Sequence, residues 1–221
     1  MENQDSHVAP HSSFPDLGLS TVSVTHGKHL PRWETNGAIY HISLHLADSV
    51  PQAELRLWRD ERARLSALAT EAKRPLTEDE IAAMRQLFND HIEKYLAAGC
   101  GDCLLKNPHA ADEVVKTIEH ANGRLYALHE WCIMPNHLHV IVGGFGAERP
   151  MREILEAWKR VSAHAINRVL GREGEVWHRD AYTRIIRDRE EYVRQLGYVW
   201  HNPEEARLKD GYRRMRYVGE A

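Results

Sequence analysis

The stretch from 131 to 142, Trp-Cys-Ile-Met-Pro-Asn-His-Leu-His-Val-Ile-Val, constrains the fold more than any other part of the chain. It predicts the end of one strand, a tight Met-Pro-Asn turn at 134–136, and a second strand that begins with two histidines. Because side chains alternate along a strand, His137 and His139 share one face. Two imidazoles side by side are a ready pair of ligands for a divalent cation. The pattern is short, however, and ordinary half-exposed strand histidines would also produce it.

Composition limits which functions such a pair could serve. The 221 residues are enough for one large domain or one and a half, with ample apolar content for a core. A formal net charge of −3 gives no overall basic signal, so any nucleic-acid surface must be a local patch. No apolar run approaches the roughly 18 residues of a membrane span, and the N-terminus lacks the apolar core of a signal peptide. We therefore expect a soluble, cytoplasmic protein without a membrane partner.

Two segments near the N-terminus show contrasting patterns. Residues 1–28 are rich in Ser, His, Pro and Asp without periodicity, which predicts a disordered head. Residues 37–47 alternate between apolar and polar side chains, which is typical of a half-buried strand. The polar face of this strand could line a site beside the central histidines. For His41 and His45, however, we expect a solvated face.

From residue 51 to about 120 the apolar spacing becomes helical, and we expect a helical insertion here. The spacing predicts one helix over 51–72 and another from Thr77, where Thr77 and Glu80 form a capping box, to residue 99. These helices carry mixed charges and no constellation of catalytic type. Their apolar stripes are expected to form core or a partner surface.

Cys100 and Cys103 have the spacing of half a zinc knuckle. A structural zinc takes four ligands, and the chain contains no second Cys-x-x-Cys pair. His91 and His109 follow no pattern that would complete the set. Zinc binding at this pair is therefore the less favoured interpretation, and with three cysteines in all the chain has no disulfide framework.

Basic residues concentrate after the histidines. Between 149 and 189 there are ten Arg or Lys against six Asp or Glu, and the tail 207–216 has five against one. Trp177, His178 and Tyr182 are interleaved with the first group. This mixture suits a nucleic-acid backbone with bases stacked on aromatic rings, and a solvated charged face is the alternative. The candidates for phosphate contact are Lys159, Arg160, Arg187, Arg213, Arg214 and Arg216.

A late helix carries a possible nucleophile. Asp188 begins a second capping pattern, which predicts a helix over 189–202 that ends before Pro203. Tyr198 and Asn202 are four positions apart and so share one face. A tyrosine hydroxyl can attack a phosphodiester when a metal polarises the phosphate, and an amide oxygen can serve as a third ligand. From spacing alone, a buried core tyrosine is the alternative.

Four blocks of sequence occur in a specific order. They are Met-Pro-Asn-His-Leu-His-Val at 134–140, Trp-Lys at 158–159, Ile-Ile-Arg-Asp at 185–188, and Gly-Tyr-Val-Trp-His-Asn-Pro at 197–203. Together they resemble the REP-associated tyrosine transposases, the single-tyrosine branch of the HUH endonucleases. The resemblance implies an α+β fold, with a ferredoxin-like antiparallel sheet, the His-x-His on a central strand and helices packed on the sheet. The domain would span 29–221, with the helical insertion at about 51–120.

The resemblance also implies roles by position. His137 and His139 would bind a divalent metal, Mg²⁺ or Mn²⁺, with Asn202 as the third ligand and Tyr198 as the nucleophile. The implied activity is cleavage and rejoining of single-stranded or hairpin DNA from repetitive extragenic palindromes, through a 5′-phosphotyrosine, and a homodimer is compatible with it. Two alternatives stay open. One is a non-transposing DNA-binding protein of the same fold, and the other is a metal-dependent phosphoesterase that uses water and does not need Tyr198.

Overall fold

A five-stranded antiparallel sheet forms the centre of the protein, with strands in the order β6-β3-β5-β4-β7. The computed structural model describes residues 23–26, 31–34, 38–74, 77–143 and 150–217. The strands of the sheet are β3 (Ile39–His45), β4 (Ala127–Ile133), β5 (His137–Gly143), β6 (Tyr182–Ile186) and β7 (Arg213–Arg216).

The connectivity of the first four strands of this sheet is ferredoxin-like. Helices lead from β3 to β4, a tight turn joins β4 to β5, and α5 (Met151–Leu170) leads to β6. Strand β5 pairs with both β3 and β4, so the two histidines lie on a central strand. The predicted fold class is therefore confirmed.

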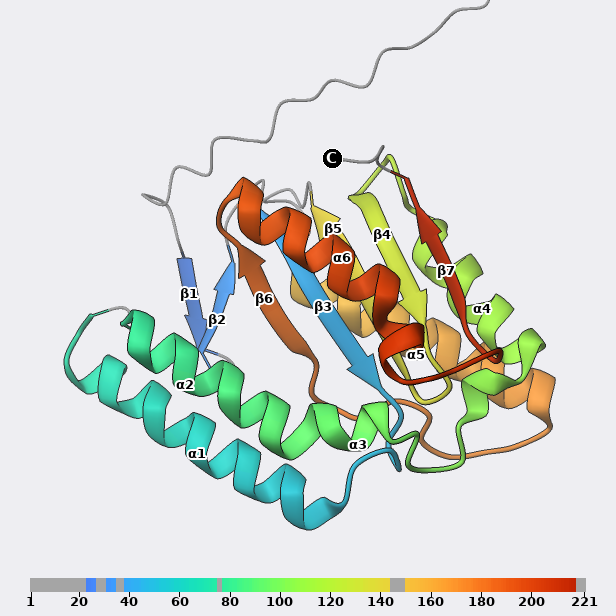
Figure 1. Ribbon diagram of the computed structural model, residues 1–221, viewed down its shortest axis with the longest axis horizontal. Helices are drawn as coiled ribbons and strands as arrows, with labels where there is room; N and C mark the ends of the chain where they lie inside the picture. The colour runs from blue at the N-terminus through green and yellow to red at the C-terminus, as the bar shows by residue number, and fades with distance from the viewer. Residues whose placement is uncertain (1–22, 27–30, 35–37, 75–76, 144–149, 218–221) are drawn as a thin grey trace, which may run out of the picture.

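The alternation of side chains gives the sheet two different faces. Tyr40, Ile42 and Leu44 of β3 lie on the face that packs against α4 (Pro108–Glu119) and α5. Burying one such aliphatic side chain contributes about 1.5–3 kcal/mol, so this face anchors the sheet. The opposite face packs partly beneath α6 (Arg189–Glu205) and carries both central histidines. Figure 1 shows α6 in front of the sheet and α5 behind it.

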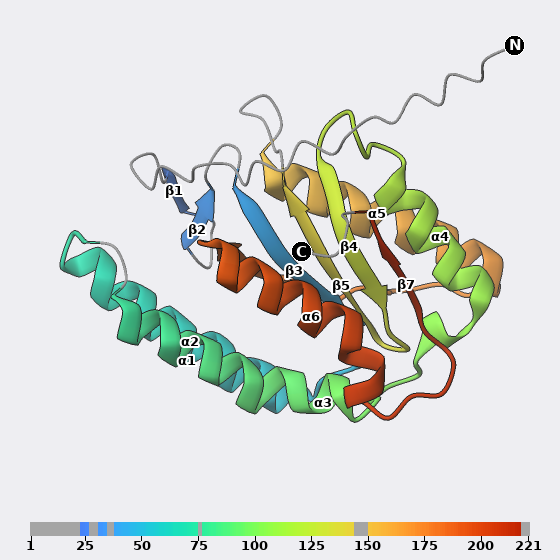
Figure 2. The ribbon, with the colours of Figure 1, turned by 45° about the horizontal axis from the view of Figure 1, so that its top comes forward.

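A helical arm lies beside the β6 edge of the sheet. It consists of α1 (Gln52–Glu71), α2 (Glu78–Phe88), a π-helical turn (Asn89–Glu93) and α3 (Lys94–Ala97). Its apolar side chains form a cluster of their own, made of Val50, Leu55, Trp58, Phe88, Ile92 and Leu96. The ring of Phe88 stacks on Tyr182 of β6, with centroids 3.9 Å apart. Figure 2 shows the arm running alongside α6.

The cap predicted at the start of α2 is present, but the helix is not continuous. The Thr77 backbone N–H donates to the Glu80 carboxylate at 2.8 Å, and the Glu80 N–H donates to the Thr77 hydroxyl at 3.2 Å. The π-helical turn at 89–93 interrupts the helix that was expected to run to residue 99. Such a turn contains one extra residue, so the side chains after it project in a different direction.

The C-terminal part differs from the prediction in two places. Asp188 caps α6, because its carboxylate accepts from the Glu191 N–H at 2.7 Å. The expectation that Pro203 ends this helix is wrong, since α6 continues to Glu205 with the proline in its last turn. The basic tail contains an unpredicted strand, β7, which pairs with β4.

The predicted head is described only in small part. Ser23–His26 (β1) pairs antiparallel with Pro31–Glu34 (β2), and the other residues of 1–28 lie outside the described residues. The expected disorder is therefore wrong for Ser23–His26, and for the rest of residues 1–28 it stays a prediction. Among the helices that the structure describes, none is both long and apolar enough to cross a membrane.

Candidate metal centre and nucleophile

The two histidines of β5 are completely buried rather than half-exposed. Their rings lie 4.7 Å apart between centroids, on the face of the sheet that α6 covers. The Nε2 atoms of His137 and His139 have no hydrogen-bond partner within the protein. A buried nitrogen without a partner costs free energy, so these two atoms are poised to accept a ligand.

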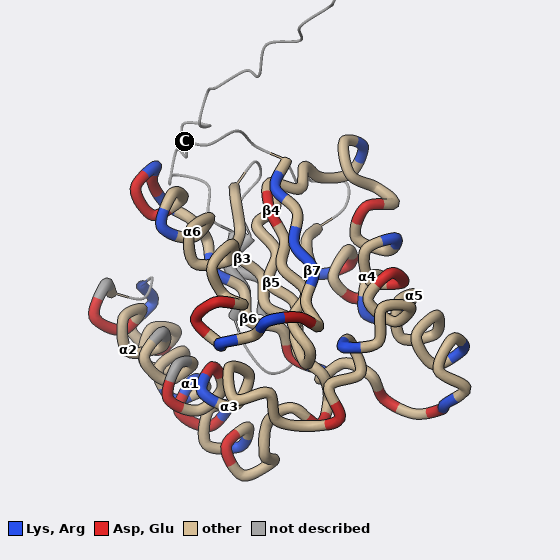
Figure 3. The backbone as a smooth tube through the Cα atoms, turned by 45° about the vertical axis from the view of Figure 1, so that its right-hand side comes forward, with Lys and Arg blue, Asp and Glu red and all other residues tan. Residues whose placement is uncertain are grey.

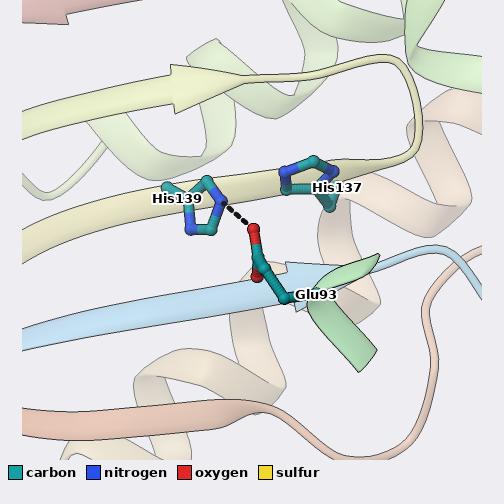
Figure 4. Close-up of side chains that lie close together, drawn as sticks. All are labelled: Glu93, His137 and His139. Atoms are coloured by element: carbon teal, nitrogen blue, oxygen red, sulfur yellow. Dashed lines mark ion pairs between the residues drawn. The ribbon is translucent and has the colours of Figure 1, made fainter. Parts of the chain in front are cut away.

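Glu93, the last residue of the π-helical turn, completes a group of three. Its carboxylate lies 3.9 Å from Nε2 of His139, and one ligand atom from each of Glu93, His137 and His139 lies within 4.8 Å of the others. Figure 4 shows the carboxylate reaching from the arm towards the strand that carries both imidazoles. The expectation that the insertion carries no group of catalytic type is therefore wrong.

The sequence around Glu93 gave only a weak signal. No basic residue lies three or four positions from it, so it has no partner of the usual helical ion-pair spacing. Its neighbour Ile92 is buried in the core of the arm. An unpaired acid beside a buried apolar residue is common, however, and does not by itself indicate a site.

The three side chains fit a divalent cation. Two neutral imidazole nitrogens and a carboxylate oxygen are a mixed donor set that accepts several divalent ions and leaves coordination positions open for substrate. Oε2 of Glu93, like the two imidazole Nε2 atoms, is buried without a hydrogen-bond partner. A cation held between the three side chains would give both imidazole nitrogens a partner, which is the strongest indication of metal binding in the described residues.

Burial sets the protonation of these groups. It lowers the pKa of His137 to about 3, with the nearby His45 adding to the effect, and it holds the pKa of His139 well below its usual value. Burial also raises the pKa of Glu93, while the hydrogen bond from Tyr198 opposes this rise. The imidazoles are therefore neutral at pH 7, as metal ligation requires.

The polar face of β3 supports the pair. The Ser43 hydroxyl lies 2.8 Å and Nε2 of His41 lies 3.1 Å from Nδ1 of His139. Partners at Nδ1 hold a ring so that Nε2 faces a metal. The expectation that His41 and His45 face solvent is wrong, because each is only 4% exposed. The alternation along the strand predicts correctly which face His41 and His45 share. It does not predict that helices cover this face.

We expect the stability of the fold to decrease as the pH falls below about 6. Burial lowers the pKa of His41 and His45 to about 4 and the pKa of His137 to about 3, and it holds the pKa of His139 well below its usual value. Unfolded histidines titrate near 6.5, so the unfolded chain takes up protons that the fold excludes. Each ring then removes up to about 1.4 kcal/mol of unfolding free energy per pH unit.

Urea unfolding at several pH values between about 7 and 5 measures this dependence. His45→Asn should reduce the slope by one histidine's share, because one buried titrating ring is removed. An unfolding free energy that stays constant over this range would show that the rings titrate normally.

The α6 helix brings the candidate nucleophile into the same site. The Tyr198 hydroxyl donates to Oε1 of Glu93 at 2.6 Å, and its ring meets that of His139 edge-on at 5.3 Å. Burial, together with the negative charge of Glu93, raises the pKa of Tyr198 well above its usual value. Asn202 is buried one turn further on, close enough to influence the pKa of both His137 and Tyr198. Its role as a metal ligand stays a prediction.

The arginines of the tail are engaged by acidic groups of the fold. Arg213 pairs with Asp112, Arg216 pairs with the buried Glu130, and Arg214 pairs with Glu204 at 2.8 Å. Figure 3 shows basic residues along β7 and acidic ones on the neighbouring α4. A phosphate would therefore have to compete with existing carboxylate partners, and DNA binding by these arginines stays a prediction.

The other three candidate cations are spread over two elements. Lys159 and Arg160 lie on α5, where the Lys159 ammonium donates to the Arg179 carbonyl at 2.5 Å and Arg160 is exposed. Arg187 precedes α6, and its backbone N–H donates to the Glu191 carboxylate at 3.0 Å. The six predicted cations thus lie on α5, before α6 and on β7, and their contact with DNA stays a prediction.

Comparison with known proteins adds little to this geometry. No family model matches the chain, and no curated protein matches it. Among solved structures, it is similar to a REP-associated tyrosine transposase bound to a REP hairpin, with a TM-score of 0.41 and 11% identity. That match covers 79% of this chain and 71% of the other. Function therefore has to be argued from the site itself.

Proposed function

We propose that the protein is a metal-dependent transposase that cleaves and rejoins single-stranded DNA at hairpin sequences. The observation that carries this proposal is the convergence of the Tyr198 hydroxyl, the Glu93 carboxylate and two unpaired imidazole nitrogens in one buried site. A tyrosine beside metal ligands suits transfer of a phosphodiester to the protein. The four sequence blocks that resemble the REP-associated tyrosine transposases support DNA as the substrate.

The reaction begins with attack by Tyr198 on the scissile phosphorus. A bond forms between the tyrosine oxygen and phosphorus, and the bond from phosphorus to the 3′ oxygen breaks. This leaves a 5′-phosphotyrosine and a free 3′-hydroxyl, and attack by the 3′-hydroxyl of another end reverses the step and rejoins DNA. Glu93 accepts the proton of the tyrosine, since it already accepts its hydrogen bond, and the departing 3′ oxygen takes up a proton from water to become the hydroxyl.

The remaining groups of the site would bind the cation that stabilises the phosphate. His137, His139 and Glu93, with Asn202 beside them, would hold the divalent cation, Mg²⁺ or Mn²⁺. When bound, this cation stabilises the negative charge that develops on the phosphate oxygens. Because burial keeps both imidazoles neutral at pH 7, no proton competes with the cation for their nitrogens.

Hairpin DNA labelled at its 3′ end tests the proposal. Cleavage should transfer the label to the protein, and the product should survive on a denaturing gel. Fully paired DNA and excess chelator are the controls, and neither reaction should yield a labelled protein. Free labelled fragments without an adduct would indicate a phosphoesterase that uses water. Binding without cleavage would indicate a non-transposing DNA-binding protein.

Phosphate binding by α5 should appear in the salt dependence of DNA affinity. Replacing Lys159 and Arg160 by alanine is expected to lower the slope of log affinity against log salt by about 0.7 for each single-strand phosphate that the variant no longer neutralises. Arg124→Ala, an exposed change outside the six candidates, is the matched control. An unchanged slope in the double variant would exclude this helix from the DNA surface.

Arg216 is expected to contribute more to folding than to DNA binding. Arg216→Ala leaves the fully buried Glu130 without its partner, which should cost about 3–5 kcal/mol of unfolding free energy. Urea unfolding measures the loss. Replacing both residues, as in Glu130→Leu with Arg216→Met, should recover most of it, because no buried charge remains. A loss below about 1 kcal/mol in the single variant, as at a surface pair, would contradict this assignment.

A further inference from the structure

Asn136 links one imidazole of the site to the segment that follows the arm. It is the last residue of the Met-Pro-Asn turn and is completely buried. Its Nδ2 donates to the backbone carbonyl of Cys100 at 2.9 Å, and its Oδ1 lies 2.7 Å from Nδ1 of His137. The other nitrogen of that ring, Nε2, faces the candidate metal centre without a hydrogen-bond partner.

The chemistry of these partners permits only one arrangement of protons. A backbone carbonyl only accepts, so the amide must direct its NH₂ group towards Cys100 and its oxygen towards His137. The amide oxygen also only accepts, so the ring must carry a proton on Nδ1. Because the ring is neutral at pH 7 and holds a single proton, Nε2 keeps its lone pair.

We propose that Asn136 is a positioning residue that fixes the metal-binding tautomer of His137, and that the Cys100 carbonyl fixes the orientation of Asn136. This inference rests on the proposed function, because it concerns the same metal centre. If the amide turned over, its NH₂ group would face Nδ1 and the proton would have to reside on Nε2. That nitrogen could then no longer bind a cation.

His139 has no equivalent device. Its Nδ1 lies beside the Ser43 hydroxyl and Nε2 of His41, and each of these groups can either donate or accept. On the Nδ1 side, both tautomers of His139 can therefore be accommodated by rotation of the hydroxyl and a change of tautomer at His41. The control of tautomer by a fixed carbonyl is specific to His137.

Two hydrogen bonds hold the segment that follows Cys100 in place. The Asp102 backbone N–H donates to the Asp48 carboxylate at 2.7 Å, and the Leu105 N–H donates to the Pro135 carbonyl at 3.1 Å. The segment after the arm is thus fastened both to the end of β3 and to the turn that carries Asn136. This gives the Cys-x-x-Cys segment a role through its backbone, without a zinc ion.

The test replaces Asn136 and observes the imidazole directly. Asn136→Leu keeps the size of the side chain but can neither donate nor accept. Nitrogen-15 NMR of histidine-labelled protein should show His137 protonated on Nδ1 in the unmodified chain and a mixture of tautomers in the variant. Affinity for Mn²⁺, measured by titration calorimetry without DNA, should fall by about 10- to 100-fold. Asn136→Asp keeps an acceptor for Nδ1 and should keep the tautomer.

Asn122→Leu is the matched control. Asn122 accepts a hydrogen bond from the Leu128 N–H at 2.9 Å, at the far end of β4 from the turn. Its loss should lower the melting temperature without changing the tautomer of His137 or the affinity for Mn²⁺. Unchanged Mn²⁺ affinity in Asn136→Leu would overturn the inference, as would a proton on Nε2 in the unmodified chain.

The tautomer also separates this inference from the proposed function. Suppose that the unmodified chain binds no Mn²⁺ but carries the proton of His137 on Nδ1, and that Asn136→Leu gives a mixture of tautomers. The proposed metal centre would then be wrong, and the positioning role of Asn136 would be confirmed. If Asn136→Leu did not fold, the test would use the tautomer of His137 in the unmodified chain and in Asn136→Asp. A variant with an aspartate that lost the Nδ1 tautomer would contradict the role of the acceptor.

Discussion

Tyr198→Phe is expected to reduce formation of the covalent DNA adduct by about 10⁴-fold or more, because it removes the attacking oxygen. Affinity for the same DNA should stay within about twofold, since the ring that packs against His139 is retained. The adduct is measured on a denaturing gel, and affinity is measured by fluorescence anisotropy. The comparison separates the chemical step from binding.

Tyr192→Phe is the matched control for this variant. The Tyr192 hydroxyl lies 2.6 Å from Nδ1 of His129, away from the metal group, so the variant should form the adduct normally. Tyr182 stacks on Phe88 of the arm. If Tyr198→Phe still formed the adduct, another tyrosine would be the nucleophile, with Tyr192 and Tyr182 the candidates, and the proposed geometry would be wrong.

His139→Ala and His137→Ala are each expected to abolish cleavage and to reduce Mn²⁺ affinity by more than the roughly 100-fold typical of removing a supporting partner. Each variant removes one of the two imidazole nitrogens that converge with the Glu93 carboxylate. Calorimetry measures the affinity, and excess chelator should have the same effect on the unmodified protein. His129→Ala, outside this group, should behave normally. Cleavage at full rate in chelator would remove the metal from the mechanism.

The histidine pair and the tyrosine were predictable because their geometry is local. A strand has a period of two, so the shared face of His137 and His139 does not depend on the rest of the fold. A helical spacing of four likewise sets Tyr198 and Asn202 on one side of α6. The Asp188 cap was predictable for the same reason, since its hydrogen bond spans three residues.

Glu93 was not predictable because its position depends on non-local packing. It lies 44 residues before His137 (137 − 93 = 44), and it reaches the site because a π-helical turn and the packing of the arm direct it there. The burial of His41 depends in the same way on distant segments. Strand β7 was missed because Arg-Arg-Met-Arg lacks an apolar alternation, and its charges are matched by acids from elsewhere.

The composition of β7 has a consequence for association between copies of the chain. The outer edge of a sheet offers unpaired backbone groups to any extended chain, and short, charged edge strands discourage such pairing. Strand β7 is an edge of four residues, three of them arginine, and the arm packs beside the opposite edge at Tyr182. Neither margin of the described sheet is a good template for an added strand. The five-stranded sheet is thus guarded against edge-to-edge aggregation, and any contact between copies that involves this sheet would use helices or loops instead of its edges.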